Sequence, residues 1–319
     1  LNGRDLILDL QDRLHFEGKF NSRDLMVKDE QFMDLDVATL RTDMPTLRGL
    51  IPSFNPPSNF NKLGRFNFEG EFFGFFVDFA VTGKMRTPLG RGEMDMQMVL
   101  KGGRENAKYS GGLTLFDFDL GTWSDDSNFG NITFNTKVKE GKGLRLSTAN
   151  AILEGTIDSL EFRGYDYKNV ALNGRLKQNL FDGDLKVSDR NINLDFRGEI
   201  DFTDTIPIFD FFADINHLAL KNLNLSKHDL QLSGKVDLTL QDIDPSNILG
   251  DAVVRNFKMI RNNRDTIQID SVLASSNYYD NGDKFFTVDS DVLDSKITGE
   301  FDIETIPEAF FQFMEFNYP

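Results

Sequence analysis

Apolar and polar residues alternate along much of this chain, and that period of two residues limits its fold more than any other feature. Residues 130–138 place Ile132, Phe134 and Val138 on one side, and residues 191–202 keep the same alternation throughout. Successive side chains of a strand point to opposite faces, so such segments have one apolar and one polar face. The sequence therefore predicts an all-β fold of roughly 20 strands, each about six to nine residues long.

Glycine followed by alternating apolar residues, in the pattern Gly-x-apolar-x-apolar, recurs along the chain. Chance would give this pattern roughly four times. Glycine at such a place suits a turn exit, a bulge or a bend where a sheet must curve. The pattern begins at Gly64, Gly92, Gly111, Gly130, Gly183, Gly198, Gly234, Gly250 and Gly299.

A longer pattern is shared by Gly92–Met96, Gly198–Phe202 and Gly299–Ile303, at intervals of 198 − 92 = 106 and 299 − 198 = 101 residues. Thr-Ile-Pro follows the second and third copies, at 205–207 and 305–307. A fixed period is typical of stacked repeats, although short strand motifs also recur by chance. We therefore predict one continuous β segment over residues 1–319, with repeat boundaries near 92, 198 and 299.

Signals for other local structure are few. Met44–Pro52 is compatible with one helical turn, and Pro307–Glu315 with the start of a helix, because proline is favoured at a first-turn position. Loops are predicted at Pro56–Ser58 and Trp123–Ser127. Tyr279–Asp283 contains Asn-Gly and predicts a hairpin turn.

The composition combines many phenylalanines with a strong negative charge. Phe occurs 31 times, whereas Trp occurs once and Tyr six times, and the net charge is −16. Phenylalanine has no polar group, so it suits a surface that is purely apolar. The acidic balance, without clusters of Lys and Arg, argues against nucleic acid and against flat docking on an anionic bilayer.

Two features that the sequence lacks limit the class of protein further. The chain has no cysteine, which excludes thiolate metal sites and cysteine nucleophiles. No apolar run approaches the roughly 20 residues that a membrane helix needs. The chain begins at Leu1 rather than Met, which suggests a fragment of a longer protein.

Residues that could carry chemistry do not form a recognisable catalytic pattern. His15, His217 and His228 lack metal-ligand spacing, and Asp117 and Asp119 alternate with phenylalanine, as expected on the polar face of a strand. Patterns for a serine nucleophile or a phosphate-binding loop are missing. We therefore expect a protein that is not an enzyme and that has no cofactor and no metal site.

The predicted apolar face has two interpretations. It is either an ordinary core, in which two sheets pack face to face, or a surface left open for lipid. Alternation alone does not separate them. A membrane-spanning barrel would also alternate, but it would show girdles of Trp and Tyr, which are scarce here.

A resemblance to a known family bears on the choice between a core and an open surface. The residues that carry the resemblance are, in order, Phe116–Gly121, Leu160–Val170, Leu172–Lys177, Leu180–Val187 and Asn191–Gly198. Together they resemble the TamB translocation and assembly module of Bacteroidota, in the AsmA-like superfamily. The likeness is strongest over residues 109–225, and elsewhere it extends only to the general character of the sequence.

The resemblance implies a fold, a location and partners. Proteins of this family are periplasmic, are anchored in the inner membrane by an N-terminal helix, and have an elongated, curled antiparallel sheet that forms a U-shaped groove with an apolar interior. They act with a BamA-like outer-membrane protein in outer-membrane biogenesis and phospholipid transport. This chain lacks the anchor, so we expect it to be held at the inner membrane through parts outside it.

On this interpretation the chain conducts phospholipid acyl chains along the groove and supports assembly of outer-membrane proteins. The rival hypothesis is a chaperone that offers a strand edge to unfolded outer-membrane β-barrel proteins without lipid transport. The predicted groove lining is Ile132, Phe134, Val138, Leu144, Leu146, Leu185, Val187, Leu194, Phe196, Ile200, Phe202, Val236, Leu238 and Leu240.

Overall fold

A computed structural model shows that the chain is all-β, as predicted, with eighteen strands and three short helical segments among the described residues. The chain divides into two compact units, Leu1–Gln178 and Asn179–Pro319. The described residues are 2–24, 27, 30–51, 56, 58–103, 105–144, 148–242, 247–262 and 264–299.

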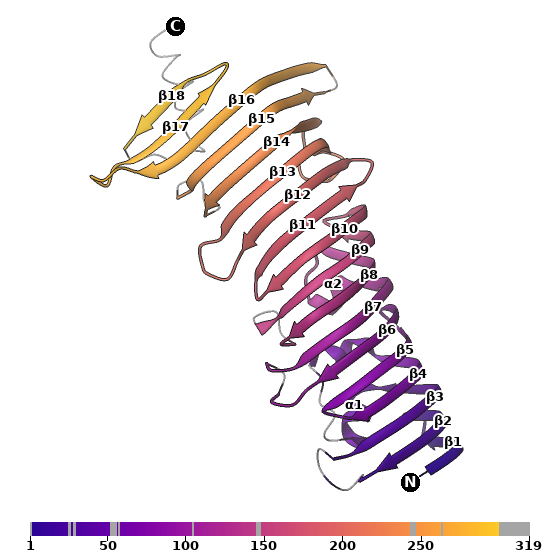
Figure 1. The fold of residues 1–319 in the computed structure, drawn as a ribbon. Coiled ribbons are helices and arrows are strands. Elements are labelled where there is room, and N and C mark those ends of the chain that lie inside the picture. Colours follow the sequence, from indigo (N-terminus) through magenta and orange to yellow (C-terminus); the bar gives the residue numbers. More distant parts are fainter. Residues whose placement is uncertain are drawn as a thin grey trace. The chain divides into compact units, whose positions relative to one another are not determined.

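The first unit is an antiparallel meander in which each strand pairs with the next one in the chain (Figure 1). Within its described residues no ladder joins the first strand to the tenth, so this sheet is open. Its strands are β1 (Asn2–Leu10), β2 (Leu14–Arg23), β3 (Phe32–Asp43), β4 (Arg65–Phe75), β5 (Asp78–Thr87), β6 (Gly90–Val99), β7 (Lys108–Asp119), β8 (Phe129–Lys142), β9 (Asn150–Phe162) and β10 (Tyr165–Lys177).

The second unit repeats this arrangement, again with sequential antiparallel pairing. The predicted turn at Tyr279–Asp283 is confirmed, because the Tyr279 N–H donates to the Asp283 carbonyl at 2.9 Å and closes a hairpin. The strands are β11 (Leu180–Ser188), β12 (Ile192–Asp201), β13 (Ile208–Ala219), β14 (Leu230–Gln241), β15 (Leu249–Arg261), β16 (Asp265–Tyr278), β17 (Lys284–Ser290) and β18 (Ser295–Thr298).

Most strands are longer than the predicted six to nine residues, and bulges explain the difference in some of them. In β7 the register shifts between Leu115 and Phe118, and in β13 between Ile215 and Leu218. A bulge inserts an extra residue, which breaks the alternation in the sequence although the strand continues. A pattern-based boundary therefore stops too early at such a point.

Two glycines of the recurring pattern lie in mid-strand with a backbone that other residues rarely adopt. Gly111 in β7 has φ 138° and Gly198 in β12 has φ 143°. A Cβ atom would lie 2.0 Å from the Asp95 carbonyl oxygen at the first position and 2.3 Å from that of Asp210 at the second. Because glycine has no Cβ atom, it allows the neighbouring strand to approach this closely.

The three helical segments all belong to two long connections of the first unit. The helix α1 (Met44–Leu50) and the 3₁₀ helix η1 (Ser58–Leu63) lie between β3 and β4, and α2 (Leu120–Ser124) lies between β7 and β8. Because β3 and β7 are both odd-numbered strands of one meander, both connections leave the sheet at the same rim. The helical turn predicted near residues 44–52 is confirmed, whereas the loop predicted at Trp123–Ser127 begins inside α2.

These segments pack on the apolar side of the first sheet and form its core with it. The buried members of this core are Val37, Met44, Leu63, Phe66, Phe68, Leu89, Phe118 and Ile132. The helix predicted at Pro307–Glu315 lies outside the described residues. The repeat boundaries remain a prediction: Gly92 lies inside β6, Gly198 inside β12, and Gly299 one residue after β18.

Candidate functional site: the apolar sheet faces

In the second unit, strand register gathers the apolar residues onto one face, called here the second-unit apolar face. Residues directly opposite each other in an antiparallel pair point to the same side. One row across the sheet is Leu185, Phe196, Ala213, Val236, Val254 and Val272. A parallel row is Gly183, Gly198, Phe211, Leu238, Ala252, Ala274 and Val288.

Side chains in these rows are buried or half-buried, and neighbours pack on one another. Phe196 is 8% exposed, and its ring centroid lies 5.0 Å from that of Phe211 on the next strand. Val236 and Leu238 on β14 are half-buried. Over residues 179–242, 247–262 and 264–299 the structure has no helix that could cover this face.

Charged residues take the opposite side of the same strands and pair across them. Lys186 bonds Asp195 at 3.0 Å, and Arg197 bonds Asp184 at 2.6 Å, both between β11 and β12. The hydrogen bond to Asp184, followed by its negative charge, raises the pKa of Arg197. These groups are exposed, so each ion pair adds little to stability, but together they keep this side hydrated.

The structure brings eight of the predicted lining residues together on the second-unit apolar face. They are Leu185, Val187, Leu194, Phe196, Ile200, Val236, Leu238 and Leu240. Phe202 lies just beyond β12, is 50% exposed, and keeps its ring centroid 5.8 Å from that of Phe209.

The predicted lining residues of the first unit have different environments. Ile132 is 9% exposed and belongs to the core under the helical segments, and Phe134 packs against that core. Val138 is 8% exposed on β8, and Leu144 follows the end of that strand in a bend. Leu146 lies outside the described residues.

The first sheet also has an apolar face, called here the first-unit apolar face, and most of it was missed in the sequence. One row that spans all ten strands is Leu8, Phe16, Leu40, Phe68, Met85, Gly92, Leu115, Phe134, Ile157 and Val170. The alternation in residues 64–98, which places Met94, Met96 and Met98 on one side of β6, was the available signal.

Part of the first-unit apolar face lies beneath the helical segments α1, η1 and α2, which together are called the cover. Met44 of α1 and Leu63 of η1 are each 5% exposed. The Trp123 ring of α2 contacts Phe60 of η1 and Phe118 of β7, with ring centroids 5.1 and 5.7 Å away. The cover is therefore part of a packed core.

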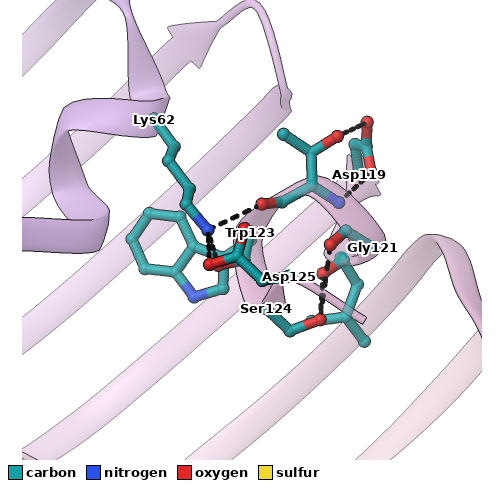
Figure 2. A network of polar contacts seen from close by, with 8 residues as sticks. Lys62, Asp119, Gly121, Trp123, Ser124 and Asp125 are labelled. Carbon is teal, nitrogen blue, oxygen red and sulfur yellow. Dashed lines mark hydrogen bonds and ion pairs between the residues drawn. The ribbon is translucent and has the colours of Figure 1, made fainter. Parts of the chain in front are cut away.

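A clasp of polar contacts joins the two halves of the cover at the surface (Figure 2). The Lys62 ammonium of η1 donates to the Thr122 carbonyl at 3.0 Å and to the Trp123 carbonyl at 3.1 Å. It also pairs with the Asp125 carboxylate at 2.5 Å. The cation thus binds the carbonyl end of α2, where backbone acceptors have no partner within the helix.

Each half of the cover is also fixed locally. The Asp43 carboxylate caps α1 by accepting the Thr46 N–H at 2.8 Å, and Arg48 of α1 donates to the Asn61 side-chain oxygen of η1 at 2.5 Å. Asp119 caps α2 by accepting the Thr122 hydroxyl at 2.6 Å and the Thr122 N–H at 2.8 Å. The hydroxyl bond, and then the N–H bond, lower the pKa of Asp119.

Groups that could do other chemistry are dispersed. His15 pairs with Asp9 at 2.6 Å on the polar side of β1 and β2, while His217 lies on β13 and His228 before β14. Among the described residues, no three His, Asp or Glu side chains gather closely enough to hold a metal ion. The described helices are too short to cross a bilayer.

Comparison with known proteins adds no relative to this picture. No protein-family model matches the chain, and neither the curated proteins nor the solved structures contain a significant match.

Proposed function

We propose that this chain is a lipid-conducting segment, in which the apolar sheet faces line a groove that shelters the acyl chains of phospholipids while the polar faces meet water. The observation that carries the proposal is the second-unit apolar face. The two rows described above run across β11–β16 and β11–β17, they carry no charged side chain, and no helix lies over them among the described residues.

Burial energies explain why such a face needs no catalytic group. Each methylene that moves from water onto an apolar surface gains about 0.8 kcal/mol. Two acyl chains with about 30 methylenes in all would gain on the order of 20 kcal/mol on this basis. A bilayer offers nearly the same gain, so exchange between bilayer and groove is close to neutral, and movement along uniform rows meets no large barrier.

The surroundings follow from the same proposal. A conduit of this kind serves an aqueous space between two membranes, which in the TamB-like interpretation is the periplasm. The chain would then be anchored to the inner membrane through parts outside it, and would deliver lipid beside a BamA-like outer-membrane protein. The polar faces, with pairs such as Lys186–Asp195, suit a body immersed in that space.

Lipid contact can be tested at a single side chain. The photoreactive residue p-benzoylphenylalanine, placed at Leu238, should crosslink phospholipid in cells, and the purified chain should carry phospholipid detectable by mass spectrometry. The same probe at Leu273, which lies 49% exposed on the polar side of β16, is the matched control and should not crosslink lipid. Absence of lipid at both positions and in the purified protein contradicts the proposal.

A charge on the apolar face should block lipid binding. Leu238→Asp places a carboxylate between Phe211 and Ala252, where acyl chains would have to desolvate it. We expect lipid that co-purifies with the protein to fall by on the order of tenfold. Leu273→Asp makes the same change on the polar face and should leave the lipid content unchanged. Equal lipid content in both variants would count against the groove.

One observation favours a second candidate function, a strand-edge chaperone. Among the described residues β1 pairs on one side only, with β2, and its Ile7, Leu8 and Leu10 are 62%, 48% and 41% exposed. An unpaired strand edge with exposed apolar residues can add a strand from another protein. Crosslinks from Ile7 to outer-membrane proteins, with none from Leu238 to lipid, would favour this alternative.

A further inference from the structure

The cover is incompatible with a groove that is open along its whole length, because it occupies apolar surface that the proposed function needs. Phe68, Met85 and Leu115 belong to one row of the first-unit apolar face, and all three belong to or pack against the core that the cover completes. Phe68 is 9% exposed, and Met85 and Leu115 are half-buried, so the cover and the core together leave little of these side chains open to hydrocarbon. The second-unit apolar face carries no such segment among its described residues.

The construction of the cover sets how it can move. Its segments contain seven, six and five residues, lengths at which an isolated helix is marginal, so they depend on their contacts. Both connections leave the sheet at one rim, and β5 and β6 lie between them in the sheet. The halves therefore meet across two strands and are held together by the Lys62 clasp and by the Phe60–Trp123 ring contact.

We propose that the cover is a lid on the first-unit apolar face and that Lys62 is the positioning residue that keeps it closed. Without the ammonium group, the carbonyls at the end of α2 and the Asp125 carboxylate lose their shared partner, and η1 and α2 separate more often. Opening exposes Phe68 and Met85 and lets hydrocarbon into this part of the face. That last consequence rests on the proposed lipid-conducting function, whereas the lid itself does not.

The chain contains its own reporter for this motion. Trp123 is the single tryptophan of the sequence and lies in α2 (Figure 2). Its fluorescence therefore reports on the cover alone. A second reporter is available because the chain has no cysteine, so a thiol introduced at Met85, which packs against the core that the cover completes, is the only reactive thiol in the protein.

The experiment compares Lys62→Met, which keeps the aliphatic stem but removes the charge, with Lys62→Arg, which keeps a donor cation. Acrylamide quenching of Trp123 and the maleimide reaction rate in the Met85→Cys background are measured for each, after circular dichroism has shown that the strands are intact. We expect Lys62→Met to raise the thiol reaction rate on the order of tenfold, the usual effect of losing a charged hydrogen bond, and to increase quenching. Lys62→Arg should restore both to near the wild-type values.

Other outcomes overturn the lid. Unchanged quenching and labelling in Lys62→Met show that the clasp does not hold the cover, and an equal effect of Lys62→Arg shows that the charge is not the cause. A matching rise in labelling of Leu238→Cys, on the second-unit apolar face, shows general loosening instead. Failure of the proposed lipid-conducting function is seen separately. In that case Leu238 gives no lipid crosslinks, although Lys62→Met still changes the quenching of Trp123 and the labelling of the thiol.

If the variant with Met85→Cys folds poorly, Asp125→Asn gives an independent test by fluorescence alone. Asp125 has φ 62°, a left-handed backbone that asparagine also tolerates, so only the ion pair is lost. We expect quenching of Trp123 to rise by less than in Lys62→Met, because the two carbonyl bonds of Lys62 remain. Quenching at the wild-type value in both variants rejects the clasp.

Discussion

Adjacent glycines in β7 differ in what they contribute to the sheet. Gly111 has a positive φ and lies against the backbone of β6, so close that a Cβ atom would overlap the Asp95 carbonyl oxygen. Gly112 points to the other face, and a Cβ atom there would meet nothing within 4 Å. One glycine is thus required by the approach of two strands, while its neighbour is not.

This contrast gives a matched pair of substitutions. Gly111→Ala should lower the free energy of unfolding by at least about 2 kcal/mol, from the unfavourable φ and the overlap with β6. Gly112→Ala should be neutral or slightly stabilising, because alanine reduces the entropy of the unfolded chain. Urea unfolding followed by circular dichroism measures both. Equal losses in the two variants would show that the close approach at Gly111 is not a constraint.

At the scale of elements, α2 depends on one titrating cap. Because hydrogen bonds from Thr122 depress the pKa of Asp119, the capping contribution is complete above the unfolded pKa of about 3.9. It is lost as the pH falls through the lower pKa of the folded protein. We expect acrylamide quenching of Trp123 to stay constant from neutral pH down to about 4 and to rise below it.

Asp119→Asn is the control for this pH dependence. Asparagine caps a helix about as well as aspartate but does not titrate, so the variant should lack the part of the acid response that belongs to α2. The comparison is made by quenching titrations on both proteins over the same range. Identical curves would assign the acid response to other carboxylates.

Alternation predicted the elements of the second unit well. It placed Leu185, Phe196 and Val236 on one face before any register was known, because the period of two survives wherever a strand has no bulge. It could not show whether that face is covered. The same period arises in a packed core and in an open surface, and only the arrangement of the connections distinguishes them.

Apart from the helical turn near residues 44–52, the cover escaped prediction because its elements are too short to show a helical period. The five residues of α2 complete little more than one turn, so Trp123 and the polar residues after it indicated a loop. Ile132 and Phe134 therefore counted as lining, although they pack in the core that the cover completes. Lys62 carried no signal, since its partners are 60 and more residues away in sequence.

At the scale of the whole molecule, the net negative charge is concentrated in the unit whose apolar face has no cover among its described residues. Residues 1–178 contain 23 Lys and Arg against 25 Asp and Glu, a difference of −2, whereas residues 179–319 contain 12 against 26, a difference of −14. The unit whose apolar face has a cover is thus nearly neutral. The unit without one among its described residues carries most of the net negative charge, and like charge opposes the association of such faces.

Salt should therefore bring chains together. The Debye length falls from about 10 Å at 0.1 M to about 3 Å at 1 M ionic strength, so repulsion between acidic units weakens while hydrophobic association does not. We expect sedimentation velocity to show reversible self-association at 1 M NaCl that is small at 0.1 M. Leu238→Asp should suppress it and Leu273→Asp should not. A salt-independent monomer in the wild-type chain would contradict this account of the charge.

Sequential pairing within each unit has a consequence for how a protein of this design can change in size. Within each unit every strand contacts its neighbours in the chain, so a hairpin can be inserted or deleted without disturbing distant pairings. A single strand cannot, since it would reverse the direction of all that follow and move their later connections to the opposite rim. Lineages of such chains should therefore differ in length by even numbers of strands, with each long connection kept on its original side.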